Sequence, residues 1–320
     1  MRNQFVTRSV LSLVCLMIIG SAVKAQLPTE TGETPVVVET NLVNVAVVVT
    51  DANGRNVSGL NQSAFSIFDN KQRQEISWFA VDDSPLSIAV VFDLSGSMSR
   101  QKMAQAKAAL QRFFENSHPL DEYSLIGFDG GPRVSVDGTH DPAEMIQRLA
   151  LQPSHGQTAL YDACRLAVTQ VLHSEHPRRA ILIISDGQDN NSQSTLSELR
   201  RQLHEEDILA YAIGINDPAR VGPAVDLGRR TLGEITASTG GRAFFPFNDD
   251  EMIRASEEIA LELRSQYQLA YRPAQFVSDR KWHQIKVSVS PLEKRGRLQV
   301  RHKAGYYSEA RSDFAHPKSR

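Results

Sequence analysis

The middle of the chain alternates between apolar runs and segments whose apolar residues recur with helical spacing. Residues 87–92 and 180–185 are nearly unbroken apolar runs, typical of strands that are buried on both faces of a parallel sheet. We predict strands at 87–92, 123–128, 180–185, 208–213 and 242–245, and helices at 102–114, 160–172, 196–203, 227–239 and 249–266. This order predicts the α/β class, with a doubly wound, mostly parallel sheet covered by helices on both faces.

Both flanks of this region have the period of two that is typical of half-buried strands. Val43, Val45, Val47 and Val49 alternate with smaller or polar residues, and further short alternating runs lie at 65–68, 76–79, 267–271, 283–290 and 298–302. Neither flank has enough strands to bury both faces of a sheet. We therefore expect residues 36–82 and 267–308 to pair in one β-sandwich-like unit, with residues 84–266 inserted between them. The alternative is two separate small β units.

The first 25 residues have the pattern of a secretory signal peptide. Arg2 and Arg8 precede an apolar run, 10–23, and small residues end at Ala25, after which we expect cleavage. A membrane anchor is the alternative, but a spanning helix needs about 20 apolar residues. We expect an exported protein, periplasmic or secreted, with no stable membrane span after cleavage. A linker at 26–35 and a tail at 309–320 complete the predicted organisation.

The composition narrows the range of partners. The hydrophobic fraction of 41% and the charged fraction of 22% are ordinary for a globular protein. Cleavage would remove three basic residues and no acid, which takes the formal charge from −2 to −5. This charge does not favour a nucleic-acid partner. The mature chain would keep Cys164 alone, so no internal disulfide is possible, and we expect this cysteine to be a core residue.

The segment that follows the first buried strand carries oxygen-bearing side chains that could form a ligand site. Asp93, Ser95 and Ser97 place a carboxylate and two hydroxyls at alternate positions, at the sheet edge where open α/β sheets bind ligands. Such oxygen donors suit magnesium, calcium or manganese. The alternative is helix capping, since Ser97 or Ser99 could begin the next helix.

Two later segments support the metal interpretation. Thr158 lies just before a predicted helix, and Asp186 ends another buried strand. Together, these three loops resemble the metal site of the von Willebrand factor type A family, and the likeness covers roughly residues 84–266. The segment 239–242 is also typical of this family. The flanks resemble a bacterial group of exported proteins with this domain. All five metal-ligand positions of the family are filled here, by Asp93, Ser95, Ser97, Thr158 and Asp186.

The resemblance implies a Rossmann-like domain with a metal ion-dependent adhesion site that holds one divalent cation. We expect Mg²⁺, with Ca²⁺ or Mn²⁺ as alternatives. Only Asp93 and Asp186 are anionic, so the cation would stay electrophilic and could accept a carboxylate from a partner. The partner would be a protein or another carboxylate-bearing ligand. We expect Asp129 or Asp189 to give second-layer support at most.

We therefore expect an adhesion or interaction module and not an enzyme. The alternative is a metal-dependent hydrolase that uses the same cation to activate water. No general base is evident beside the five ligand positions. A phosphohydrolase of the haloacid dehalogenase type would need a second aspartate where Ser95 stands, and the pattern of a serine hydrolase is absent.

Overall fold

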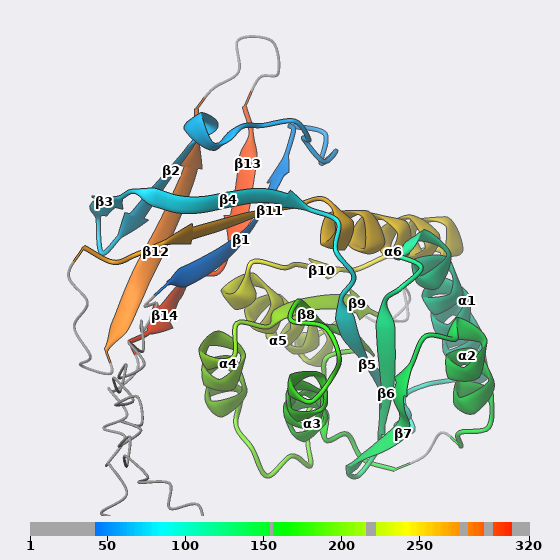
Figure 1. Cartoon of the computed structure of the whole chain (residues 1–320). Helices are drawn as coiled ribbons and strands as arrows, with labels where there is room; N and C mark the ends of the chain where they lie inside the picture. The colour runs from blue at the N-terminus through cyan, green and yellow to red at the C-terminus, as the bar shows by residue number, and fades with distance from the viewer. Residues whose placement is uncertain (1–41, 154–155, 216–221, 275–280, 291–296, 309–320) are drawn as a thin grey trace, which may run out of the picture. The chain divides into compact units, whose positions relative to one another are not determined.

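A six-stranded sheet with helices on both faces forms the middle of the chain (Figure 1). The computed structural model describes residues 42–153, 156–215, 222–274, 281–290 and 297–308, which belong to one compact unit. The predicted signal peptide, linker and tail, and residues 36–41 of the first flank, lie outside these ranges. Within them, no helix has both the length and the apolar character that a membrane crossing requires.

The strand order of the large sheet is β10-β9-β8-β5-β6-β7. Five strands run parallel, and β7 joins the edge antiparallel to β6. The strands are β5 (Ser87–Asp93), β6 (Glu122–Phe128), β7 (Pro132–Thr139), β8 (Arg179–Ser185), β9 (Leu209–Gly214) and β10 (Ala243–Phe244). The helices are α1 (Arg100–Asn116), α2 (Pro142–Ala150), α3 (Leu160–Leu172), α4 (Leu196–Glu205), α5 (Pro223–Thr239) and α6 (Asp249–Arg264).

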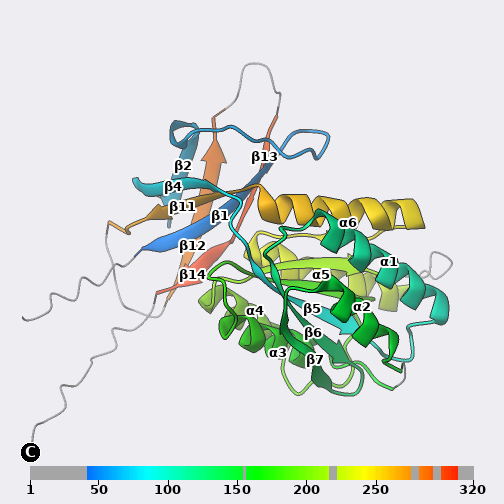
Figure 2. The same cartoon turned by 45° about the vertical axis from the view of Figure 1, so that its right-hand side comes forward.

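Alternate residues of each buried strand belong to two separate cores. Val90 and Phe92 of β5 face the core formed with α1, α2 and α6, whereas Ala89 and Val91 face the core formed with α3, α4 and α5. Figures 1 and 2 show these two groups of helices on opposite sides of the sheet. Burial on both faces explains why these strands are continuous apolar runs in the sequence. The predicted α/β class is confirmed.

The sequence-based prediction missed two elements of this layer, β7 and α2. Strand β7 carries only two large aliphatic residues, Val134 and Val136, and one of them is partly exposed. Helix α2 is only 9 residues long and buries two side chains, Met145 and Leu149. An edge strand and a short surface helix need little apolar sequence, so neither produces a strong periodic pattern. Helix α5 also begins four residues earlier than predicted, with Pro223 in its first turn.

The two flanking regions share one β-sandwich, as predicted. One sheet has the order β13-β1-β11-β4 and the other β14-β12-β2-β3. Their strands are β1 (Val43–Thr50), β2 (Phe65–Asp69), β3 (Gln72–Gln74), β4 (Ile76–Asp82), β11 (Gln266–Tyr271), β12 (Trp282–Val289), β13 (Gln299–His302) and β14 (Gly305–Tyr307), with a short 3-10 helix at Gln62–Ala64. Strand β1 pairs with β11 and β13, and β2 pairs with β12. These pairings exclude two separate β units.

A buried cluster of charges joins the sandwich to the α/β layer. The carboxylate of Glu262, on α6, is 1% exposed and forms ion pairs with Arg242 at 3.0 Å and with Arg301 of β13 at 2.6 Å. Arg242 also forms an ion pair with Glu258, a half-exposed residue of α6. Nearby, Lys303 binds Asp207 at 2.8 Å. Ion pairs therefore connect α6, the last helix of the α/β layer, to the sandwich.

Candidate metal centre

The loop that follows β5 brings the first three predicted ligands together. The backbone N–H of Ser95 donates to Asp93 Oδ1 at 2.9 Å, and the hydroxyl oxygens of Ser95 and Ser97 lie 3.1 Å apart. Ser99, not Ser97, caps helix α1, because its hydroxyl accepts the backbone N–H of Lys102 at 3.3 Å. Capping of the helix therefore explains Ser99, but it does not explain Ser95 or Ser97.

Asp93 is fully buried at the end of β5. Its Oδ2 atom accepts a hydrogen bond of 2.7 Å from the hydroxyl of Ser185, at the end of the adjacent strand β8. Burial raises the pKa of Asp93, and the negative charge of Asp186 raises it further, while the hydrogen bonds from Ser95 and Ser185 act in the opposite direction. A nearby cation would offset both the burial and the repulsion.

The loop before α3 is tied to both of the other loops. The carbonyl of Gly156 accepts the N–H of Gly96 at 3.2 Å, which joins it to the Asp93 loop. The N–H of Thr158 donates to the side-chain oxygen of Asn190 at 2.9 Å, and its carbonyl accepts the N–H of Asn190 at 3.0 Å. These bonds fix Thr158, which is 5% exposed, between the loops that carry Asp93 and Asp186.

Asp186 follows β8 and is 4% exposed. Gln188 donates to both of its carboxylate oxygens, from its backbone at 3.1 Å and from its side chain at 3.3 Å. Gly187 has a φ of +80°, a conformation that favours glycine. Gly228 of α5 lies against the carbonyl of Asp186, so closely that a Cβ atom there would be 2.2 Å from the oxygen. Helix α5 thus packs directly on the Asp186 loop.

The donor set fits a hard divalent cation. It combines two almost fully buried carboxylates with three hydroxyl-bearing residues, and no described Lys, Arg or His forms an ion pair with Asp93 or Asp186. Among the described ranges, no cluster of three or more His, Cys, Asp or Glu side chains could hold a metal. The candidate centre contains only two carboxylates, and its other oxygen donors are hydroxyls. Oxygen donors of this kind suit Mg²⁺, Ca²⁺ or Mn²⁺ better than softer metals.

The two other aspartates of this edge hold the surrounding loops. Asp129 pairs with Arg133 at 3.1 Å, and its carbonyl accepts the N–H of Ala159. Asp189 accepts the N–H of Tyr161 in the first turn of α3 and the hydroxyl of Ser192. Sequence reasoning did not identify the supporting roles of Ser185, Asn190 and Gly228. The pattern G-Q-D-N-N after a buried strand was the only local signal for Asn190.

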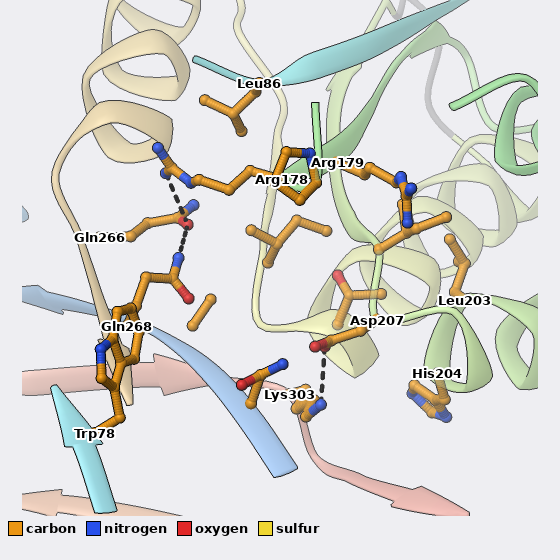
Figure 3. Close-up of a pocket in the computed structure, with 16 residues that line it drawn as sticks. Trp78, Leu86, Arg178, Arg179, Leu203, His204, Asp207, Gln266, Gln268 and Lys303 are labelled. Carbon is orange, nitrogen blue, oxygen red and sulfur yellow. Dashed lines mark hydrogen bonds and ion pairs between the residues drawn. The ribbon is translucent and has the colours of Figure 1, made fainter. Parts of the chain in front are cut away.

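A cavity of about 280 Å³ lies elsewhere, between the sandwich and the α/β layer (Figure 3). Gln266 and Gln268 of β11, Trp78 of β4 and Lys303 line it. Other lining residues precede β5 or begin β8 and β9, which places the cavity at the amino ends of the parallel strands. Asp93 and Asp186 lie at the carboxyl ends, so this cavity is not part of the candidate metal centre.

Comparison with known proteins gives one match in sequence. Residues 88–188 match the family model described as the von Willebrand factor type A domain. This segment contains all five predicted ligand positions. A search of curated proteins found no match.

Several solved structures resemble the fold at low sequence identity. A von Willebrand factor type A protein from Catenulispora acidiphila is 12% identical, with 78% of this chain and 74% of that chain covered and a TM-score of 0.48. An aerotolerance-related membrane protein from Bacteroides fragilis is 19% identical, with 56% and 98% covered and a TM-score of 0.48. Proximal thread matrix protein 1 from the mussel byssus, described with a zinc-occupied MIDAS motif, is 20% identical, with 61% and 50% covered and a TM-score of 0.47.

Proposed function

We propose that this chain, whose residues 88–188 match the von Willebrand factor type A domain, is a binding module in which one divalent cation links the protein to a carboxylate of its partner. The proposed ligands of the cation are Asp93, Ser95, Ser97, Thr158 and Asp186. The proposed cation is Mg²⁺, with Ca²⁺ or Mn²⁺ as alternatives. We further propose that the protein acts outside the cytoplasm, on the basis of the pattern in residues 1–25, and that it is not an enzyme.

The observation that carries the proposal is the pairing of two buried carboxylates without a cationic partner. Asp93 ends β5, and Asp186 directly follows the neighbouring strand β8; burial raises the pKa of Asp93, and the charge of Asp186 raises it further. Burying two like charges near each other is costly unless a cation offsets them. The hydroxyls of Ser95 and Ser97 add oxygen donors without adding charge.

The surrounding residues have distinct tasks in this proposal. Ser185 orients Asp93 through one carboxylate oxygen, and Gln188 orients Asp186. Asn190 holds the backbone of Thr158 on both its N–H and its carbonyl side. A bound divalent cation would supply an electrophilic centre for a partner carboxylate. The two carboxylates would formally neutralise a divalent cation, but the neutral hydroxyl donors would leave it a Lewis acid with a position that a partner carboxylate could take.

The test combines metal titration with recovery of partners. Isothermal titration of the protein with MgCl₂, MnCl₂ and CaCl₂ should show one site, which Asp93→Ala removes. Partners recovered from the native source on immobilised protein in Mg²⁺ should be released by chelator and should be missing with immobilised Asp93→Ala. Metal-independent partners that Asp93→Ala retains would contradict the proposal, as would metal binding to that variant with unchanged affinity.

A further inference from the structure

Large apolar side chains lie exposed beside the candidate metal centre. Leu227 at the start of α5 is 60% exposed, and Phe247, just after β10, is 63% exposed. Single exposed apolar residues are common on protein surfaces. These two differ from such residues because they flank a site that is proposed to bind a partner.

Leu227 lies close to the candidate metal centre because α5 contacts the Asp186 loop. Its neighbour Gly228 lies against the carbonyl of Asp186, so the backbone of α5 and the backbone of a proposed metal ligand touch. Leu227 and Arg229 are the residues on either side of this contact. Any larger residue at position 228 would push α5, and the two flanking side chains with it, away from the metal loop.

Phe247 is placed near the same edge by the segment that follows β10. The ring of Phe245 covers Gly214, where a Cβ atom would be 2.5 Å from the ring, and Gly214 pairs with Ser185 in the sheet. The guanidinium of Arg229 lies 4.5 Å from the centre of the Phe245 ring and 5.9 Å from that of Phe247. Arg229 therefore connects α5 to the two phenylalanines.

The result is a surface of mixed character beside the candidate metal centre, formed by Leu227, Arg229, Phe245 and Phe247; we call it the rim. The rim offers apolar area and one positive charge, and no described carboxylate forms an ion pair with Arg229. A partner whose binding segment were purely polar would leave Leu227 and Phe247 exposed in the complex. A purely apolar partner would provide no charge for Arg229 or the cation.

We infer that the rim selects an acidic peptide segment in which a large apolar side chain stands next to the carboxylate that reaches the metal. The inference rests on the proposed function, since it assigns a specificity surface to the same site. In the bound state the peptide carboxylate faces the cation, and the neighbouring apolar side chain packs on Phe247 and Leu227. Arg229 favours negative charge in the same segment.

The test uses a phage-displayed library of seven-residue peptides with aspartate fixed at the central position, selected on the full chain in MgCl₂. We expect large aliphatic or aromatic residues to be enriched beside the aspartate by about tenfold, because burying such a side chain is worth at least that factor in a binding constant. Leu227→Ser with Phe247→Ser should abolish this enrichment but leave Mg²⁺ affinity unchanged. Both positions are exposed, so the double variant should fold.

Leu120→Ser is the matched control, because Leu120 is 61% exposed but precedes β6 at the opposite edge of the sheet. This variant should keep the enrichment. Selection of aspartate peptides without any apolar preference, or a preference that persists in the double variant, would overturn the inference and leave the proposed function intact. Selection that chelator does not prevent, and that a library with central asparagine reproduces, would overturn the proposed function itself.

Discussion

The hydroxyl of Ser185 donates a hydrogen bond of 2.7 Å to the carboxylate of Asp93, across the two central strands of the sheet. This bond occupies one oxygen of a fully buried carboxylate whose other oxygen accepts the N–H of Ser95. Asp93 is thus fixed in place before any metal binds. The same bonds offset only part of the effect of burial, because the pKa of Asp93 remains above its ordinary value.

Asp93→Ala should remove Mg²⁺ binding without unfolding the protein. The change deletes one of the two carboxylates that would face the proposed cation, and water cannot replace its charge. It also removes a buried charge that Asp186 repels, so in chelator the variant should melt at or above the temperature of the natural protein. Thermal melts with EDTA and with saturating MgCl₂ check this. Only the natural protein should gain stability from Mg²⁺; an equal gain in both would contradict the assignment.

Replacing both Ser95 and Ser97 by alanine should weaken Mg²⁺ binding less than Asp93→Ala does. The double change removes neutral oxygen donors, which water can partly replace, and it leaves both carboxylates in place. Titration calorimetry on the two variants side by side gives the comparison. A greater loss in the double alanine variant would show that the hydroxyls, and not the charges, dominate affinity.

Gly228→Ala should lower both stability and Mg²⁺ affinity. The new Cβ atom would meet the carbonyl oxygen of Asp186 at 2.2 Å, so either α5 or the metal loop must shift. We expect a loss of about 1–3 kcal/mol, the usual cost of overpacking. Gly233→Ala, in the same helix with no atom within 4 Å of the added Cβ, is the control and should stabilise by about 0.5–1 kcal/mol. Equal effects of the two changes would contradict the close contact.

The strands, and the loops that carry the candidate ligands, could be predicted from sequence because their signals are local. Continuous apolar runs arise from burial on both faces, and the spacing of Asp93, Ser95 and Ser97 lies within one loop. The roles of Ser185, Asn190 and Gly228 could not be predicted, because each depends on an atom of another loop or strand. Strand β7 was missed for a related reason, since an edge strand with few apolar residues is specified by its neighbour β6.

Glu262→Gln should destabilise the protein by about 3–5 kcal/mol, the usual cost of breaking a buried ion pair. The change leaves Arg242 and Arg301 beside a neutral amide where a buried carboxylate stood. Glu258→Gln is the matched control, because Glu258 pairs with the same Arg242 but is 48% exposed, and it should cost less than about 1 kcal/mol. Urea unfolding measures both. Similar losses in the two variants would show that the burial of Glu262 does not determine how much its ion pairs contribute to stability.

Stability should fall as the pH drops below 6.5, in part because of His302. Burial lowers the pKa of His302 below its ordinary value of 6.5, and Nε2 must remain unprotonated to accept the N–H of Val287 at 3.0 Å. The unfolded chain therefore binds the proton more readily, so acid favours unfolding from pH 6.5 down to the folded pKa. His302→Gln should reduce this slope in urea titrations between pH 7 and 5. Burial also lowers the pKa of His204. His204 should therefore account for part of the slope that remains in His302→Gln.

The chain enters and leaves the α/β layer at hydrogen-bonded neighbours, because the end of β4 and the start of β11 pair with Asp82 opposite Gln266. If the proposed site holds a partner, a pull on that partner would therefore reach the sandwich through two adjacent strands at one place. If the inserted layer unfolded, its two ends would stay joined by the pairing of β4 with β11. Refolding of the layer would then not incur the entropy cost of bringing those ends together. In mechanical terms, the pairing of β4 with β11 would let the α/β layer extend under load while the two ends of that layer stay together in the sandwich.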